Sequence, residues 1–210
     1  MTSTPNLAKV ILNENEDSAI FLGINHVDIL KIDGMEFYHY FLIILTLDPG
    51  KLAPIYNERV GLFYTVESRD FPESDLVYFD KTKIHQRSIW ETTVSASSEC
   101  AFDTTVKNLG RLIKVPNYDR ADNQKSGKRV FIKKISSNNL VSIEKVLEFE
   151  QLYDNTLNYS LLPELKKSGY NSNSFIRGAL SHSGLLSELE FPSCYKSPGL
   201  SKTVVVQLNN

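Results

Sequence analysis

The sequence predicts an α+β fold, in which an antiparallel β-sheet packs against helices. Apolar runs of strand length, separated by turn residues, fill the first part of the chain. Apolar residues at helical spacing follow only after residue 140. With 210 residues, of which 41% are hydrophobic, the chain can bury one sizeable core, so we expect a single domain over residues 1–210.

The first predicted strands include a hairpin. Residues 19–24 are typical of a strand, and residues 27–32 are predicted to form the first arm of a hairpin. The hairpin turns at Asp33-Gly34, a dipeptide suited to tight primed turns. Its returning arm, residues 37–45, is apolar on both faces and contains His39. We expect this arm to be a central strand that is covered on both sides.

Further strands are predicted with weaker patterns. Residues 60–66 and 76–79 are expected to form two of them, and residues 129–135 a third. The intervening stretch, residues 81–128, is predicted to hold loops and irregular strands because it is rich in Ser, Thr and Asn. A last strand is expected at residues 203–208.

A first helix is predicted to begin with Ser142 as its N-cap. One face of this helix collects apolar residues at helical spacing: Ile143, Val146, Leu147, Tyr153 and Leu157. Pro163 is expected near the end of the helix or in the connection beyond it, because proline cannot continue a helix.

A second helix is predicted to open at the polar cluster Asn171-Ser172-Asn173-Ser174. Its inner positions are Phe175, Ala179 and Leu180, and Gly184 is the expected stop. Asn and Ser side chains satisfy the free N–H groups at a helix start, so capping alone accounts for the cluster. The same position also suits a nucleophile, since the helix dipole and nearby N–H groups stabilise an oxyanion. Both interpretations of Ser172 stay open.

His39 is the candidate base for such a nucleophile. A serine hydroxyl reacts poorly until a neighbouring group accepts its proton, and imidazole does this near neutral pH. A histidine in an apolar strand is also an ordinary hydrogen-bonded core residue. We therefore pair His39 with Ser172 as candidate catalytic residues on the condition that the helix start packs on the strand of His39.

A histidine in an early core strand, a long β-rich stretch and then Asn-nucleophile-x-x-Phe at a helix start resemble the circularly permuted papain-like superfamily. This superfamily includes NlpC-type amidases and the lecithin–retinol acyltransferase group. The helix start of that group, Asn-Cys-Glu-His-Phe, is matched here at Asn171 and Phe175, and Ser172 stands at the cysteine position. The resemblance implies a permuted papain-like catalytic domain. The serine allows a natural serine enzyme, a cysteine enzyme whose nucleophile has been replaced, or a pseudoenzyme.

The resemblance also implies an activity. Members of the superfamily form an acyl-enzyme, and a third residue on the strand next to the histidine orients the imidazole; Thr65 and Glu67 are the nearest polar candidates. Relatives act on acyl esters of lipids or on amide bonds of cell-wall peptides. The acyltransferase-like helix start, and the use of serine on esters, favour an acyl hydrolase of the phospholipase or esterase type. The alternatives are an amidase or peptidase of cell-wall peptides whose Cys is replaced by Ser, and a non-catalytic binding module of the same fold.

Bacterial domains with an Asn-Ser-Asn-Ser-Phe helix start resemble toxins that are delivered between cells. This likeness implies an antibacterial toxin domain that is exported by a specialised secretion system. Such a protein would contact a membrane surface and be held in check by a cognate inhibitor protein.

Composition and charge set further expectations. A net charge of −2 gives no electrostatic reason to expect nucleic acid as a partner. The first residues lack the pattern of a signal peptide, and the apolar runs are too short to span a bilayer, so we expect a soluble protein made in the cytoplasm. Cys100 and Cys194 show no metal-ligand spacing, and we predict no metal and no cofactor. Two reduced thiols are expected, although a disulfide between them stays open, and Cys194 is a weaker candidate nucleophile.

Overall fold

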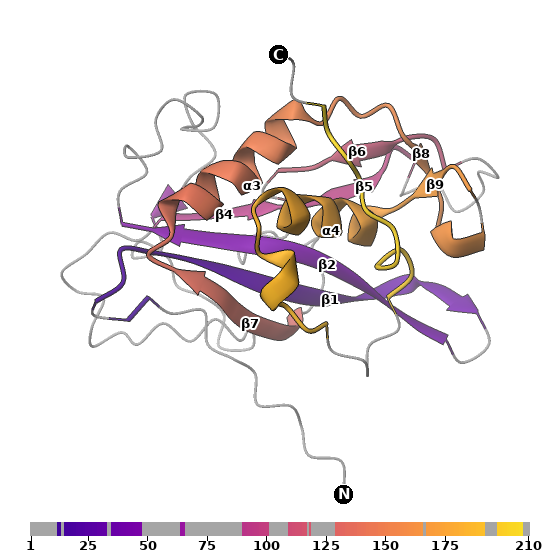
Figure 1. Cartoon of the computed structure of the whole chain (residues 1–210). Coiled ribbons are helices and arrows are strands. Elements are labelled where there is room, and N and C mark those ends of the chain that lie inside the picture. The colour runs from indigo at the N-terminus through magenta and orange to yellow at the C-terminus, as the bar shows by residue number, and fades with distance from the viewer. Residues whose placement is uncertain are drawn as a thin grey trace, which may run out of the picture.

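The fold is a five-stranded antiparallel sheet with two helices packed on one of its faces (Figure 1). This computed structural model describes residues 12–13, 15–32, 35–47, 64–65, 90–100, 109–116, 118, 129–165, 167–191 and 197–207. The strand order is β3-β4-β2-β1-β7. These strands are β1 (Ser18–Ile32), β2 (Met35–Thr46), β3 (Tyr64–Thr65), β4 (Trp90–Val94) and β7 (Arg129–Ser137). The predicted α+β class is confirmed.

The predicted hairpin is present, but its first arm is longer than expected. Residues 19–24 and 27–32 form one continuous strand, β1, instead of two. The two segments are continuous because Asn25 and His26 stay in the ladder, opposite His39 and Tyr38 of β2. The turn predicted at Asp33-Gly34 lies outside the described residues.

β2 is the middle strand of the sheet and is buried on both faces, as predicted. Tyr40, Leu42 and Ile44 belong to the core that the sheet shares with the helices. Phe41 points to the opposite face, where its ring lies over Gly23 of β1. A Cβ on Gly23 would lie 2.3 Å from that ring, so the close contact requires glycine.

The weaker strand predictions have mixed outcomes. The predicted strand at 129–135 is confirmed as β7 and runs on to Ser137. Of the predicted strand at 60–66 only Tyr64–Thr65 lies within the described residues, as β3, and residues 76–79 lie outside them. β4 is a regular strand inside the stretch predicted to be mostly irregular. Its pattern is hard to recognise because Glu91 and Thr93, which are polar, are fully buried.

Two smaller sheets and two 3₁₀ helices complete the described part of the chain. β5 (Ala96–Ser98) pairs antiparallel with β6 (Leu112–Lys114), and β8 (Asn158–Tyr159) pairs parallel with β9 (Gly169–Tyr170). The 3₁₀ helices are η5 (Pro163–Leu165) and η6 (Leu186–Glu188). β9 leads directly into the second long helix, so this parallel pair fixes the point where that helix begins.

Helix α3 (Leu140–Leu152) begins three residues earlier than the predicted cap implies. Its N-cap is Asn139, whose Oδ1 accepts the N–H of Ser142 at 3.0 Å. Ser142 therefore lies in the first turn and receives the cap. Of the predicted inner residues, Ile143, Val146 and Leu147 are buried in the helix, Tyr153 is buried at the C-cap, and Leu157 lies beyond the helix. Pro163 starts η5 in the connection that follows, as predicted.

Helix α4 (Ser172–His182) agrees with its prediction at both ends. Phe175, Ala179 and Leu180 are fully buried, and Phe175 meets Phe149 of α3 edge-on with ring centroids 5.1 Å apart. The helix stops before Gly184, which has a φ of 77°. None of the helices in the described part of the chain is long and apolar enough to span a membrane.

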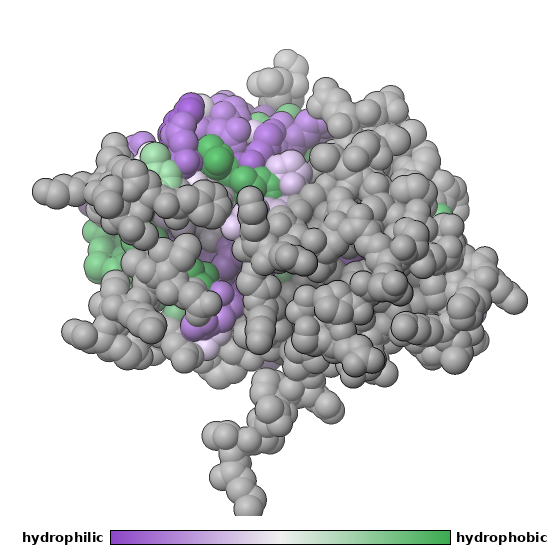
Figure 2. All heavy atoms as spheres, turned by 180° about the vertical axis from the view of Figure 1, so that it is seen from behind, coloured by the Kyte–Doolittle hydropathy of each residue, from purple (hydrophilic) through white to green (hydrophobic). Residues whose placement is uncertain are grey.

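The segment after residue 202 does not form the predicted strand over its described residues, 203–207. It crosses α4 instead of joining the sheet. The N–H of Val204 donates to the carbonyl of Ser174 at 3.2 Å, and a Cβ on Gly178 would lie 2.5 Å from the Val204 carbonyl oxygen. Seen from behind, the described residues in view mix hydrophilic and hydrophobic side chains without forming one broad apolar patch (Figure 2).

Candidate active site

The polar cluster at the start of α4 is a capping box that leaves Ser172 out. Asn171 is the N-cap, and its Oδ1 accepts the N–H of Ser174 at 3.1 Å. In return, Ser174 Oγ accepts the N–H of Asn171 at 3.4 Å. The capping interpretation is therefore confirmed for the cluster. Ser172 occupies the first helical position, and its hydroxyl takes no part in the box.

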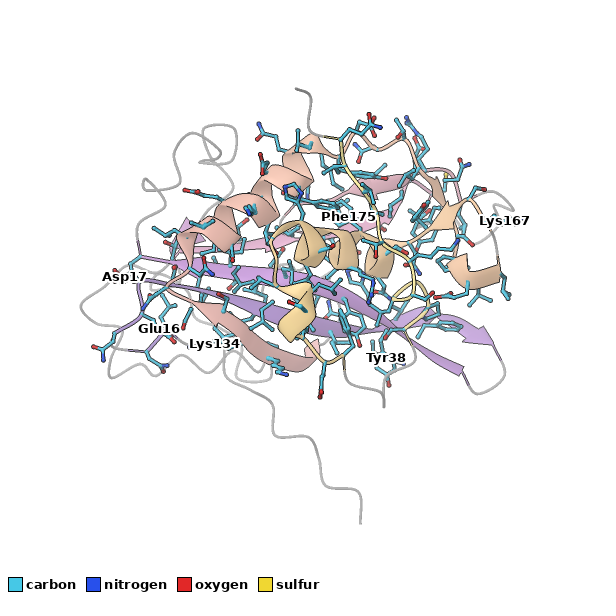
Figure 3. The ribbon with its side chains drawn as sticks, in the orientation of Figure 1. Glu16, Asp17, Tyr38, Lys134, Lys167 and Phe175 are labelled. Atoms are coloured by element: carbon cyan, nitrogen blue, oxygen red, sulfur yellow. The ribbon has the colours of Figure 1, made fainter. Side chains whose placement is uncertain are left out.

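Asn173 joins the first turn of α4 to the backbone on either side of His39. Its Nδ2 donates to the carbonyl of Tyr38 at 3.0 Å, and its Oδ1 accepts the N–H of Tyr40 at 2.9 Å. The ladder between β2 and β4 ends at Leu42 and Val94, so this amide continues the edge of β2 where β4 stops. In Figure 3, Tyr38 lies on β2 near the first turn of α4. The start of α4 thus packs on β2, the strand of His39. This meets the condition under which His39 and Ser172 are paired as candidate catalytic residues.

The His39 ring is held by Ser95. Its Nε2 lies 3.0 Å from Ser95 Oγ, and the ring stacks on Phe41 with centroids 6.2 Å apart. His39 therefore projects from the same face of β2 as Phe41, and the helices cover the opposite face, where Tyr40 lies. α4 is joined to this strand along its edge, where Asn173 bonds to the backbone of Tyr38 and Tyr40.

Ser95 was not a candidate from the sequence. It follows β4 directly and is fully buried, so the neighbouring strand supplies a hydroxyl to the imidazole. Thr65 lies on β3, which β4 separates from β2, and Glu67 lies outside the described residues. Within the described residues it is therefore Ser95, and not Thr65, whose hydroxyl contacts the imidazole. The polar residues that make β4 hard to recognise from the sequence also make the position of Ser95 hard to predict.

The side chain of Ser172 lies near that of Tyr159, a second residue that the sequence did not indicate. Ser172 is 7% exposed, and Tyr159 is partly buried against the main core. Burial raises the pKa of Tyr159 to about 12, although the nearby hydroxyl of Ser172 acts in the opposite direction. At neutral pH the phenol is therefore protonated, and Tyr159 is no base for Ser172.

The C-terminal turn is tied to the same helix start. Pro198 O accepts Asn171 Nδ2 at 2.7 Å and Asn173 Nδ2 at 2.9 Å, and Gly199 O accepts Ser174 Oγ at 3.0 Å. These hydrogen bonds give Asn171, Asn173 and Ser174 a structural role in the fold.

Cys100 is a free, partly buried thiol, and Cys194 lies outside the described residues. Within the described residues, no three His, Cys, Asp or Glu side chains are arranged to hold a metal ion.

Comparison with protein-family models, with curated proteins and with solved structures finds no match to this chain. The likeness to permuted papain-like enzymes therefore depends on the residues of this chain alone.

Proposed function

We propose that the protein is an acyl hydrolase that works through an acyl-enzyme, with Ser172 as nucleophile and His39 as base. The observation that carries this proposal is the docking of Asn173 on both sides of His39, which fixes the residue next to Ser172 on the strand of His39. The order of these parts, histidine strand first and nucleophile helix last, favours a permuted papain-like topology.

The groups around the two residues suit this chemistry. Ser95 on Nε2 would hold the imidazole in place while the ring receives the proton of Ser172. The N–H groups of Ser172 and Asn173 have no acceptor among the hydrogen bonds of the described residues, so they can serve an oxyanion. Attack by Ser172 Oγ on an acyl carbonyl would form the ester, and water would then release the acyl group.

Exposed apolar side chains favour a lipid ester over a peptide. Leu165 is 79% exposed on η5, and Val205 is 80% exposed just after the residue that bonds to Ser174. η5 is tied to the C-terminal turn, because Glu164 Oε1 accepts Ser201 Oγ at 3.1 Å. Both apolar groups therefore belong to segments attached to the start of α4, where they would meet a bilayer. An antibacterial toxin restrained by a cognate inhibitor is the setting we infer for such an enzyme.

The low exposure of Ser172 favours a second candidate, the non-catalytic binding module. A hydroxyl that is 7% exposed must be uncovered before a substrate can reach it, whereas a binding module has no such requirement. The third candidate is an amidase of cell-wall peptides whose cysteine at position 172 has been replaced by serine. In this case the original nucleophile would be sulfur, where the first candidate uses oxygen.

Acyl release from mixed phospholipid vesicles separates these candidates. The parent protein is compared with Ser172→Ala, Ser172→Cys and His39→Ala. Release that is lost in the two alanine variants supports the lipid hydrolase. Activity that appears only with Ser172→Cys points to a disabled thiol enzyme, tested in parallel on cell-wall peptides. If all four folded proteins are inactive on both substrates, the binding module is the remaining candidate.

A further inference from the structure

We propose that Glu164 is a positioning residue, which holds the start of α4 in the orientation that presents Ser172 to His39. This inference rests on the proposed function and deepens it by adding a residue that acts through others, without touching the substrate. Three observations carry it. The peptide between Pro198 and Gly199 is bonded on both sides, the turn that contains it has two possible forms, and the side chains that it contacts lie next to Ser172.

The peptide group between Pro198 and Gly199 is held from both sides. Its N–H, which belongs to Gly199, donates to Oε1 of Glu164 on η5. Its carbonyl, which belongs to Pro198, accepts from Asn171 Nδ2 at 2.7 Å and from Asn173 Nδ2 at 2.9 Å. The N–H and the C=O of a trans peptide point in opposite directions. Glu164 therefore lies on one side of the peptide, and the two amides lie on the other.

This peptide is the central unit of a turn in which it can take two orientations. The N–H of Leu200 donates to the carbonyl of Ser197 at 3.4 Å. With Pro198 and Gly199 between these residues, and a φ of 95° at Gly199, this is the pattern of a type II turn. A type I turn needs a negative φ at the same position, and glycine adopts either sign at little cost. In that form the Pro198 carbonyl would face away from α4. The bond to Glu164 therefore stabilises the form that the helix start uses.

The Pro198 carbonyl also determines how the two amides are oriented. An asparagine amide has a donor end and an acceptor end, and a carbonyl can bond only to the donor end. With both Nδ2 groups directed at this carbonyl, the Oδ1 of Asn171 faces the N–H that it caps in α4. The Oδ1 of Asn173 faces the N–H of Tyr40 on β2. The contacts on either side of Ser172 are thus oriented by one carbonyl.

The charge of Glu164 strengthens these contacts. A carboxylate that accepts from the N–H of a peptide polarises the peptide, so that its carbonyl becomes a better acceptor. The same Oε1 accepts the hydroxyl of Ser201 at 3.1 Å, so one oxygen atom holds two points of the turn. Because Glu164 itself is exposed, its loss should loosen the helix start and leave the hydrophobic core in place.

The test measures how fast a fluorophosphonate labels Ser172, since this probe reacts with activated serines. The parent protein is compared with Ser172→Ala, Glu164→Ala, Glu164→Gln and Asp154→Ala, and peptide mapping identifies the labelled residue. The dependence of the rate on probe concentration separates probe binding from the bond-forming step. Urea unfolding measures the stability of each variant, so that all rates refer to folded protein.

Asp154→Ala is the matched control, because Asp154 makes the same two kinds of bond at an exposed position. Its Oδ1 accepts the N–H of Thr156 at 3.3 Å and the hydroxyl of Thr156 at 2.7 Å. These bonds close a local turn after α3 and involve no residue of α4. Glu164→Gln is the conservative variant, since its amide oxygen can accept both bonds without the charge.

Glu164→Ala should lower the rate of the bond-forming step by about 10–100-fold, because a misplaced nucleophile reacts slowly even when the probe is bound. Probe binding should stay unchanged. Glu164→Gln should recover most of the rate, and Asp154→Ala should match the parent. A merely structural role would lower the stability of Glu164→Ala but leave its folded form labelled at the parental rate.

The outcomes separate the two proposals. If Glu164→Ala is labelled as fast as the parent, or faster, the role of Glu164 is overturned and the serine hydrolase stands. A parent that is labelled no faster than Ser172→Ala would overturn the hydrolase, and the role of Glu164 with it.

Discussion

The side-chain amide of Asn173 bonds to the edge of β2 at Tyr40, where a neighbouring strand would otherwise pair. Its Oδ1 accepts a hydrogen bond from the N–H of Tyr40 at 2.9 Å. The same amide donates to the carbonyls of Tyr38 and Pro198. One side chain thus connects the central strand, the helix start and the C-terminal turn. The stability of this junction can be tested separately from any catalytic activity.

Asn173→Asp is predicted to destabilise the fold because the carboxylate keeps the acceptor for Tyr40 but cannot donate to the two carbonyls. The loss should be about 1–3 kcal/mol in the free energy of unfolding, measured in urea. Asn158→Asp is the control, since the side chain of Asn158 is exposed, and it should change stability by less than about 0.5 kcal/mol. Equal effects at the two positions would show that the amide of Asn173 does not hold the junction.

The cap and the candidate nucleophile are adjacent, and they should respond differently to alanine. Asn171→Ala removes the acceptor for the Ser174 N–H and is expected to cost about 1–2 kcal/mol of stability. Ser172→Ala removes a hydroxyl outside the capping box and should cost clearly less, because alanine favours a helix. Thermal unfolding of both variants measures the difference. A larger loss for Ser172→Ala would indicate that its hydroxyl has a mainly structural role.

Gly199 should tolerate no side chain, because it has a φ of 95° and a Cβ there would lie 1.9 Å from Asn171 Oδ1. Gly184 has a similar φ of 77° but nothing within 4 Å of the position of a Cβ. Gly184→Ala should therefore cost about 1 kcal/mol from backbone strain alone. Gly199→Ala should cost more, since it also displaces the N-cap. Urea unfolding of the two variants tests this order, and a smaller loss at Gly199 would contradict the proposed contact with the cap.

Stability should fall in acid through Glu16, which pairs with Lys134 across the end of the sheet (Figure 3). Burial acts to raise the pKa of Glu16, but hydrogen bonds from Asn13 and the charge of Lys134 outweigh it and hold the pKa below its usual value. The folded state thus binds this proton less readily than the unfolded state. The contribution is complete above the unfolded pKa, near 4.5, and is lost as the pH falls through the lower folded value. The stability difference between the parent and Glu16→Gln should shrink between pH 6 and pH 3, and a constant difference would refute the linkage.

Membrane contact is predicted to involve Leu165 and Val205, the exposed apolar residues on segments tied to the start of α4. Leu165→Ser and Val205→Ser should each weaken binding to phospholipid vesicles, by about tenfold for a side chain buried in the bilayer. Hydrolysis of a water-soluble ester should be unchanged. Vesicle flotation and ester turnover give the two readouts.

Val141→Ser is the matched control for membrane contact, because Val141 is 60% exposed at the start of α3. That end of α3 lies beside Ser18, which accepts the N–H of Asn138 at 2.9 Å and pairs with Thr46 at one end of β2. Asn173 docks at Tyr38, roughly 25 Å along the strand. If all three serine variants lose vesicle binding equally, the contact does not lie at the start of α4.

The parts of the fold that local pattern determines could be predicted from the sequence. The apolar run around His39 indicated the central strand, and the polar cluster before Phe175 indicated where α4 begins. At α3 two residues of capping type lie close together. Asn138, with a φ of 52°, turns the chain so that Asn139 becomes the cap and Ser142 does not.

The partners of the two candidate residues could not be predicted, because they depend on contacts between distant segments. Ser95 lies 56 positions from His39 and follows a strand whose inward residues include Glu91 and Thr93. Tyr159 comes to Ser172 only through a two-residue parallel ladder. Such short pairings have no periodicity to recognise. The segment around Val204 has the composition of a strand, but its N–H bonds to Ser174 instead of to the sheet.

The central claim is that Ser172 is acylated with His39 as its base. The most direct measurement is intact-protein mass spectrometry after rapid acid quench of the protein with a short-chain phospholipid, followed by peptide mapping. The account predicts one acyl group on the peptide that contains Ser172, absent in Ser172→Ala and strongly reduced in His39→Ala. An acyl group on another residue, or no adduct from a folded protein that releases fatty acid, would contradict it.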